Sequence, residues 1–88
     1  MFSFDKFQST ITNIFTWSYL KGFHVLALKP ASIHPDDHYL AIVLIDTNPN
    51  DILDVKSRYV TWRWNTDSMN NGRYFTSLRD AKVDFELR

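Results

Sequence analysis

Residues 72–88 constrain the fold more than any other part of this chain. Ser77 followed three residues later by Asp80 predicts the N-terminal cap of a helix, in which the hydroxyl accepts from a backbone amide of the first turn. An apolar stripe at helical spacing follows, formed by Leu78, Ala81 and Phe85. We therefore expect an amphipathic C-terminal helix that begins at Ser77 and packs this stripe on a sheet.

The middle of the chain predicts the strands of that sheet. Residues 38–45 are apolar on both faces, which is typical of a central strand covered on both sides. Residues 56–65 alternate, so we expect the tryptophans to be buried and the other face to look outward. The inner face then holds Val60, Trp62 and Trp64, and the outer face holds Tyr59, Thr61 and Arg63. A tight turn at 70–72 and a brief strand at 73–75 complete this part.

The N-terminal part begins as a helix, because Phe4, Phe7 and Ile11 share one helical face. Two interpretations of residues 14–29 are open. They form a hairpin that turns at Lys21-Gly22, or the first helix continues to Leu20 and Gly22 ends it. The β-branched residues between 10 and 16 tip the balance towards the hairpin, with the helix ending near 12–13.

These elements add up to one compact α+β domain over residues 1–88. We expect an N-terminal helix, a three- to four-stranded antiparallel sheet and a C-terminal helix packed on the sheet, arranged in two layers. The chain is 44% hydrophobic and 16% aromatic, which excludes a disordered segment.

The compartment follows from what the sequence lacks. A secreted domain of this size would usually carry disulfides, and the chain contains no cysteine, so we expect a cytoplasmic protein. Its start has no secretory signal pattern. The longest apolar run, 40–45, falls far short of the roughly 20 residues that a membrane helix needs, so we expect no membrane partner.

Signatures of catalysis are weak. No serine or threonine stands in a nucleophile context, and two glycines do not make a phosphate-binding loop. The segment 34–38 carries residue types that bind zinc, but its spacing matches no established site and is more typical of a polar turn. The weak metal candidates are His34, Asp36, Asp37 and His38. We therefore predict a protein that is not an enzyme and holds no cofactor.

The charges point to a binding surface. The net charge is zero, yet residues 56–82 hold six basic residues against two acidic ones. Tyrosine and arginine together are typical of protein–protein hot spots, and also of sheets that stack single-stranded bases. Zero net charge favours protein contact, because nucleic-acid affinity depends largely on phosphate neutralisation. The predicted partner-binding residues are Arg58, Tyr59, Arg63, Arg73 and Tyr74.

A resemblance bears on the partner. The closing pattern, Gly72-x-Tyr74-Phe75-x-Ser77-Leu78-x-Asp80-Ala81-x-x-Asp84-Phe85-x-x-Arg88, resembles the ends of small accessory proteins of phages, plasmids and other mobile elements. This resemblance implies a small non-enzymatic protein of the anti-CRISPR type, which covers a functional surface of a host enzyme in the bacterial cytoplasm. It names no functional residue.

Three hypotheses follow. The first is an inhibitor that binds a host protein or ribonucleoprotein, such as a defence nuclease. The second is a single-stranded nucleic-acid-binding module that uses the aromatic and basic sheet face, and the third, which we favour least, is a metal-dependent enzyme. A homodimer through an apolar edge strand is a further prediction.

Overall fold

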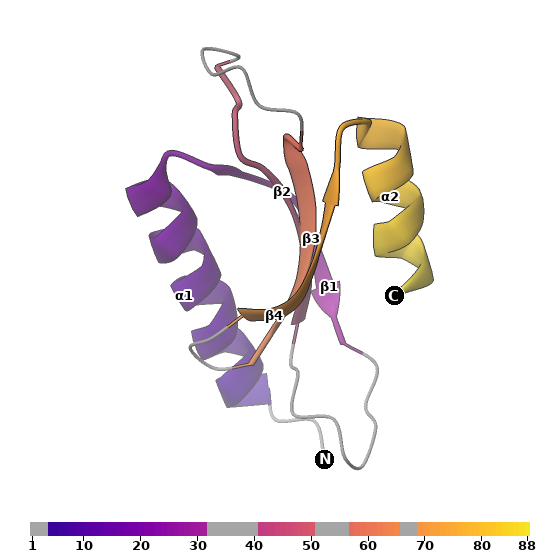
Figure 1. The fold of residues 1–88 in the computed structure, drawn as a ribbon. Coiled ribbons are helices and arrows are strands. Elements are labelled where there is room, and N and C mark those ends of the chain that lie inside the picture. Colours follow the sequence, from indigo (N-terminus) through magenta and orange to yellow (C-terminus); the bar gives the residue numbers. More distant parts are fainter. Residues whose placement is uncertain (1–3, 32–40, 51–56, 66–68) are drawn as a thin grey trace.

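The residues that the structure describes form two helices and one four-stranded sheet. The computed structural model describes residues 4–31, 41–50, 57–65 and 69–88. The elements are α1 (Phe4–Lys21), β1 (His24–Pro30), β2 (Ala41–Asp46), β3 (Tyr59–Trp64), β4 (Met69–Phe75) and α2 (Leu78–Leu87). The strands lie in the order β1-β2-β3-β4, and all three pairings are antiparallel (Figure 1). The predicted α+β class is confirmed.

The two helices cover opposite faces of the sheet, with α1 on one side and α2 on the other (Figure 1). The register pairs Val43 with Trp62, and these side chains belong to the core on the α1 side. The intervening residues face α2, as Thr61 does when its hydroxyl donates to Asp84 of α2. The prediction of two layers is therefore wrong. Because β2 is apolar on both faces and all six of its residues are buried, the sheet needs a cover on each side.

The core on the α1 side is aromatic. Trp17 of α1 meets Trp62 at a ring-centroid distance of 5.4 Å and Trp64 at 5.7 Å, both edge to face. Trp62 and Trp64 are 8% and 3% exposed, so the prediction that they are buried is confirmed. The buried members of this core are Ile14, Ala41, Val43, Ile45, Val60, Trp62 and Trp64.

The first helix extends through the segment that we predicted as the start of a hairpin. That prediction is wrong, because α1 continues unbroken to Lys21. Gly22 takes φ 74°, and its amide donates to the Tyr19 carbonyl at 3.1 Å. The amide of Phe23 donates to the Ser18 carbonyl at 2.8 Å, and the Phe23 ring packs on Trp17. This combination is a Schellman motif with its hydrophobic contact, and it ends the helix.

The β-branched residues do not break α1. The hydroxyl of Thr10 donates to the Lys6 carbonyl at 2.8 Å, and that of Thr12 donates to the Gln8 carbonyl at 3.2 Å. Each hydroxyl is thus satisfied within the helix. Packing of Ile14 and Trp17 on the sheet supplies the stability that local propensity does not.

The last strand is longer than predicted. Residues 70–72 belong to β4 and do not form the turn that we expected there. A Cβ atom on Gly72 would overlap the indole of Trp62, so the strand lies close over this ring because position 72 has no side chain. The C-terminal helix is confirmed, since the Ser77 Oγ accepts from the Asp80 amide at 3.4 Å and Ala81 is buried.

Candidate functional site

Arg58, the first of the predicted partner-binding residues, is tied into the fold. Its Nε and Nη2 donate to the two carboxylate oxygens of Asp46, each at 2.8 Å, and its backbone carbonyl accepts from the amide and hydroxyl of Thr47. The hydrogen bond from Arg58 lowers the pKa of Asp46, although burial of the carboxyl acts in the opposite direction. Arg58 therefore holds the start of β3 against the end of β2, on either side of the segment that connects the two strands.

The two predicted tyrosines lie on different faces of the sheet. Tyr59 is half-buried, and the Arg58 guanidinium lies over its ring at 5.2 Å. Tyr74 is 60% exposed and pairs with Val60, which places it on the α1 side. Its ring meets the edge of Trp62 at 6.0 Å. The five predicted residues thus do not form one continuous surface.

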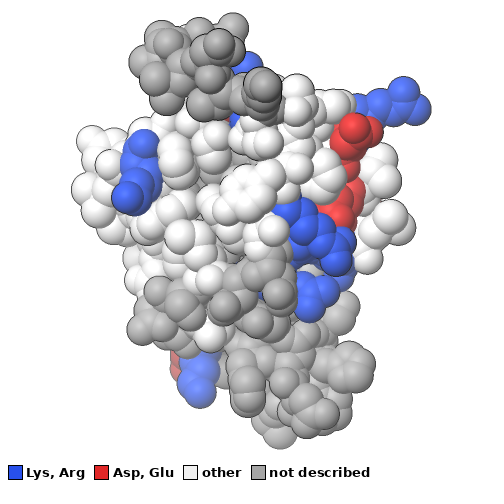
Figure 2. All heavy atoms as spheres, viewed as in Figure 1, with Lys and Arg blue, Asp and Glu red and all other residues white. Residues whose placement is uncertain are grey.

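Arg63 and Arg73 come together with a residue that the sequence did not suggest, Arg88. Together with Gly72, these three arginines line a hollow of about 380 Å³. They come from β3, from β4 and from the C-cap position of α2. We call Arg63, Arg73 and Arg88 the arginine cluster. In Figure 2, basic side chains gather beside acidic ones in the region of β4 and α2.

Asp84 holds two members of the arginine cluster in place. Its carboxylate accepts from Arg73 Nη1 at 2.7 Å, from Arg88 Nε at 3.1 Å and from the Thr61 hydroxyl at 2.6 Å. Burial raises the pKa of the Asp84 carboxyl, but the hydrogen bonds from Thr61 and Arg73 outweigh it, and the net shift is downward. Asp84 thus holds the side chains of Arg73 and Arg88 next to each other.

The positive charges of the cluster act on one another. Burial lowers the pKa of Arg88, and the nearby charges of Arg73 and Arg63 lower it further, whereas Asp84 acts in the opposite direction. An arginine keeps its proton in spite of such a shift, so three cations remain close together. The sequence offered one signal for part of this arrangement, because Asp84 and Arg88 stand four residues apart at a helix end.

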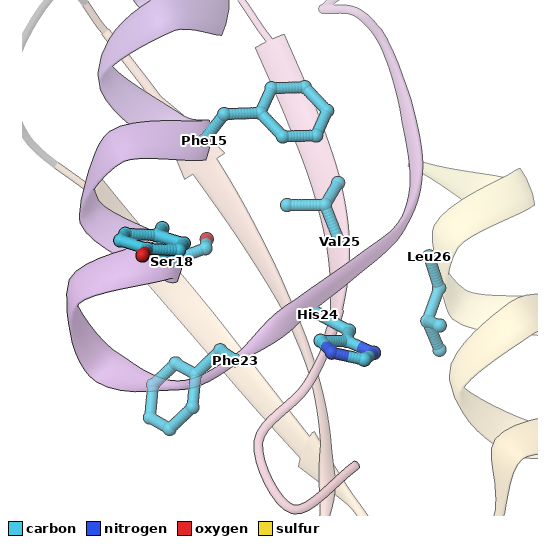
Figure 3. A pocket seen from close by; sticks show the side chains of 7 residues that line it. Phe15, Ser18, Phe23, His24, Val25 and Leu26 are labelled. Carbon is cyan, nitrogen blue, oxygen red and sulfur yellow. The ribbon is translucent and has the colours of Figure 1, made fainter.

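A second surface lies where α1 meets β1. A hollow of about 320 Å³ opens between them, and Figure 3 shows Phe15 and Ser18 from the helix and Phe23, Val25 and Leu26 from the following segment around it. Tyr19 and His24 also line this hollow. Leu26 is 44% exposed and sits at the irregularity in the β1–β2 pairing.

Large apolar side chains project from the helix at this place. Phe15 is 52% exposed, Tyr19 84% and Leu20 76%, and we call these three residues the apolar surface. Sequence reasoning missed this surface because it treated 14–20 as a strand, which put Phe15, Trp17 and Tyr19 on one side. In the helix, Phe15 and Tyr19 are four residues apart and face outward together, while Trp17 turns into the core.

The remaining predictions concern metals and membranes. His34, Asp36, Asp37 and His38 lie outside the described residues, and the described residues contain no group of three or more metal-binding side chains. Neither helix in the described part of the chain has the length and hydropathy of a membrane span.

Comparison with known proteins adds no further constraint. No protein-family model, no curated protein and no solved structure matches this chain. The candidate sites therefore depend on the geometry alone.

Proposed function

We propose that this chain is a small non-enzymatic binding protein that acts by contact with another protein, and that the apolar surface is its contact. The observation that carries the proposal is the exposure of Phe15, Tyr19 and Leu20 on adjacent turns of one helix. Exposed apolar patches of this kind commonly mark interaction sites, and tyrosine in particular supplies large contact area at low entropic cost.

Helix stability does not account for these side chains. Phenylalanine and tyrosine are weaker helix formers than alanine, lysine or glutamate, so polar residues at positions 15 and 19 would support α1 at least as well. Burial in the core does not account for them either, because Ile14 and Trp17 already fill that role. We therefore assign these exposed side chains to contact with a partner.

The residues on and around the apolar surface indicate which kind of partner surface would fit it. Lys21 and His24 flank the apolar residues and are themselves exposed, and residues 14–26 contain no acidic side chain. An apolar patch with a rim of acidic residues complements this arrangement in shape and charge. We infer from the resemblance of residues 72–88 that the partner is a host protein, such as a defence nuclease inhibited in the anti-CRISPR manner.

The nucleic-acid hypothesis receives less support from this geometry. Sheets that stack single-stranded bases use an open, aromatic sheet face. Here α1 covers one face and α2 the other, and Trp62 and Trp64 are buried beneath α1 (Figure 1). The aromatic strand that motivated the hypothesis is therefore occupied by core packing.

The test compares two double variants. Tagged wild-type protein is used to identify what co-purifies from the native host, and the purified partner is then titrated calorimetrically. The variant with Tyr19→Ala and Leu20→Ala should bind about 30-fold more weakly, which corresponds to about 2 kcal/mol for the loss of an interface anchor. Its stability should be unchanged, because both side chains are largely exposed and alanine favours the helix.

The control is the variant with Val83→Ala and Leu87→Ala, which removes two exposed apolar side chains from α2 and should bind normally. Equal affinity of the two variants would refute the assignment of the surface. Sedimentation of the free protein provides a second check. If the wild type is a dimer and the variant with Tyr19→Ala and Leu20→Ala is a monomer, the occupant of the apolar surface is a second copy of this chain. If the protein that co-purifies is a nuclease, the wild-type chain should inhibit its DNA cleavage.

A further inference from the structure

β1 is an edge strand, and no described strand pairs with its outer side. The sheet runs in the order β1-β2-β3-β4, so β1 and β4 are its two edges among the described residues. Alternate backbone N–H and C=O groups of an edge strand point away from its neighbour and can pair with another strand. Natural proteins protect such edges, in particular with charged side chains. The two edges of this sheet differ in that protection.

The β4 edge is polar, whereas the β1 edge is apolar. β4 carries Arg73, whose side chain is 58% exposed, beside a glycine and two asparagines. Most of β1 is apolar, and Leu26 is 44% exposed. The one lysine of β1, Lys29, is held on α2, where its Nζ donates to the Glu86 carbonyl at 3.2 Å and lies 4.8 Å from the centre of the Phe85 ring. β1 is therefore the less protected edge.

The edge of β1 borders the apolar surface. An open hollow of about 320 Å³ lies there, lined by residues 23–26 on the strand side and by Phe15, Ser18 and Tyr19 on the helix side. Phe15 extends from α1 towards the strand, and Val25 extends from the strand towards α1 (Figure 3). In a strand added to β1, every second side chain would face α1 and reach this hollow. Sheet edges bind extended peptides in this way, by backbone pairing together with pockets for alternate side chains.

The charges around this edge indicate which occupant fits it. No acidic residue occurs between positions 14 and 30, and the basic residues there are Lys21, His24 and Lys29. Asp46, which stands opposite His24 in the register, is buried and already paired with an arginine. A second copy of β1 paired antiparallel would bring the basic residues of the two copies towards each other, which is unfavourable. A segment that carries acidic residues would complement them.

We propose that the partner at the apolar surface contributes a short extended segment, apolar on one side and acidic at its ends, that pairs with the edge of β1. This inference rests on the proposed function and adds to it the conformation of the partner's segment. The segment is short, because the irregularity at Leu26 bends the strand and Pro30, which lacks an N–H, ends it. Its apolar side chains contact Phe15 and Tyr19 in the hollow.

The probes are synthetic peptides of the same length as β1, in which valine or leucine alternates with threonine and both ends carry glutamate. Binding to the isotope-labelled wild-type chain is followed by NMR, together with hydrogen exchange of the β1 amides. We expect saturable binding of at least one peptide, with a dissociation constant below about 1 mM. The β1 amides that exchange fast in the free protein should then exchange about tenfold more slowly or less, because they gain backbone hydrogen bonds.

Matched controls make the test specific. N-methylation of the peptide amides along one edge should abolish binding, and N-methylation along the other edge should leave it intact, because only one edge of the peptide pairs with β1. Lys21→Gln should weaken binding about threefold or more, because it removes a charge beside the peptide's acidic end. Lys82→Gln removes an exposed lysine from α2 and should leave binding unchanged.

Three results would overturn the inference. The first is the absence of saturable binding by every peptide of the set, and the second is binding that N-methylation of either edge leaves unchanged. The third is slow exchange of all β1 amides in the free protein, which would show that the chain itself covers the edge or, where the rate depends on protein concentration, that a second copy does. In each case the proposed function stands if the variant with Tyr19→Ala and Leu20→Ala still loses the captured partner, because that measurement does not involve the peptides.

Discussion

Removal of the Asp84 carboxylate should destabilise the protein strongly. In Asp84→Ala, the Arg88 side chain, 2% exposed, loses its nearby carboxylate while Arg63 and Arg73 remain beside it. The buried hydroxyl of Thr61 loses its acceptor at 2.6 Å. Breaking a buried ion pair by removing one partner costs about 3–5 kcal/mol. Because Asp84 retains some exposure and Arg73 is largely exposed, we expect the lower end, about 3 kcal/mol.

Urea unfolding followed by tryptophan fluorescence measures this change, since Trp62 and Trp64 are buried in the native state. The midpoint should fall with an unchanged slope, and the melting temperature should drop by roughly 12–24 °C. Glu86→Ala, on the same helix and exposed, is the matched control and should stay within about 0.5 kcal/mol of the wild type. A loss below about 1 kcal/mol in Asp84→Ala would show that the carboxylate does not support the cluster.

Two further predictions concern the ends of other elements. Gly22→Ala places a Cβ atom on a backbone with φ 74° and should lower the free energy of unfolding, measured in urea, by about 1–2 kcal/mol. Gly22→Asn should lower it less, because asparagine tolerates this conformation. Equal losses in the two variants would contradict the role of the backbone conformation. Arg58→Ala should cost about 2 kcal/mol at neutral pH, because Asp46 stays buried without its bidentate partner. The pKa of the Asp46 carboxyl is lower in the folded protein than its value of 3.8 in the unfolded chain. The ionised carboxyl therefore stabilises the fold at pH values above 3.8, and this stabilisation is lost as the pH falls through the folded-state pKa. The stability difference between Arg58→Ala and the wild type should therefore narrow in acid, and a constant difference down to about pH 2 would refute this account.

The sequence predicted the elements whose signals are local. The alternation in β3 placed Trp62 and Trp64 inward, and the Ser77 cap placed the start of α2, because each pattern depends on neighbours within one element. Residues 14–20 satisfy two periods at once, and a local pattern does not decide between them. Packing of Trp17 on Trp62 and Trp64 decides for the helix, and that contact joins residues far apart in the chain.

The candidate sites were less predictable for the same reason. Arg63 and Arg73 were recognised by residue type, but the carboxylate that organises the cluster lies in α2, and its hydrogen bond to Thr61 spans 23 positions. Arg58 has the same residue type and yet serves the fold, because its side chain pairs with Asp46 at the end of β2. Composition alone does not show which carboxylate each arginine pairs with.

The two-sided cover of the sheet explains where binding sites remain. A sheet with one open face would offer its aromatic residues to a ligand, and this was the basis of the predicted contact around Tyr59 and Arg63. Here β2 is buried on both faces, so α1 and α2 occupy both faces of the sheet (Figure 1). Among the described residues, the accessible places include the outer side of a helix and the region where a helix ends against the sheet. The apolar surface on α1 is the first kind of place, and the arginine cluster beside the end of α2 is the second. Because the helices lie on opposite faces, the apolar surface on α1 and the arginine cluster beside the end of α2 are separate places on the molecule.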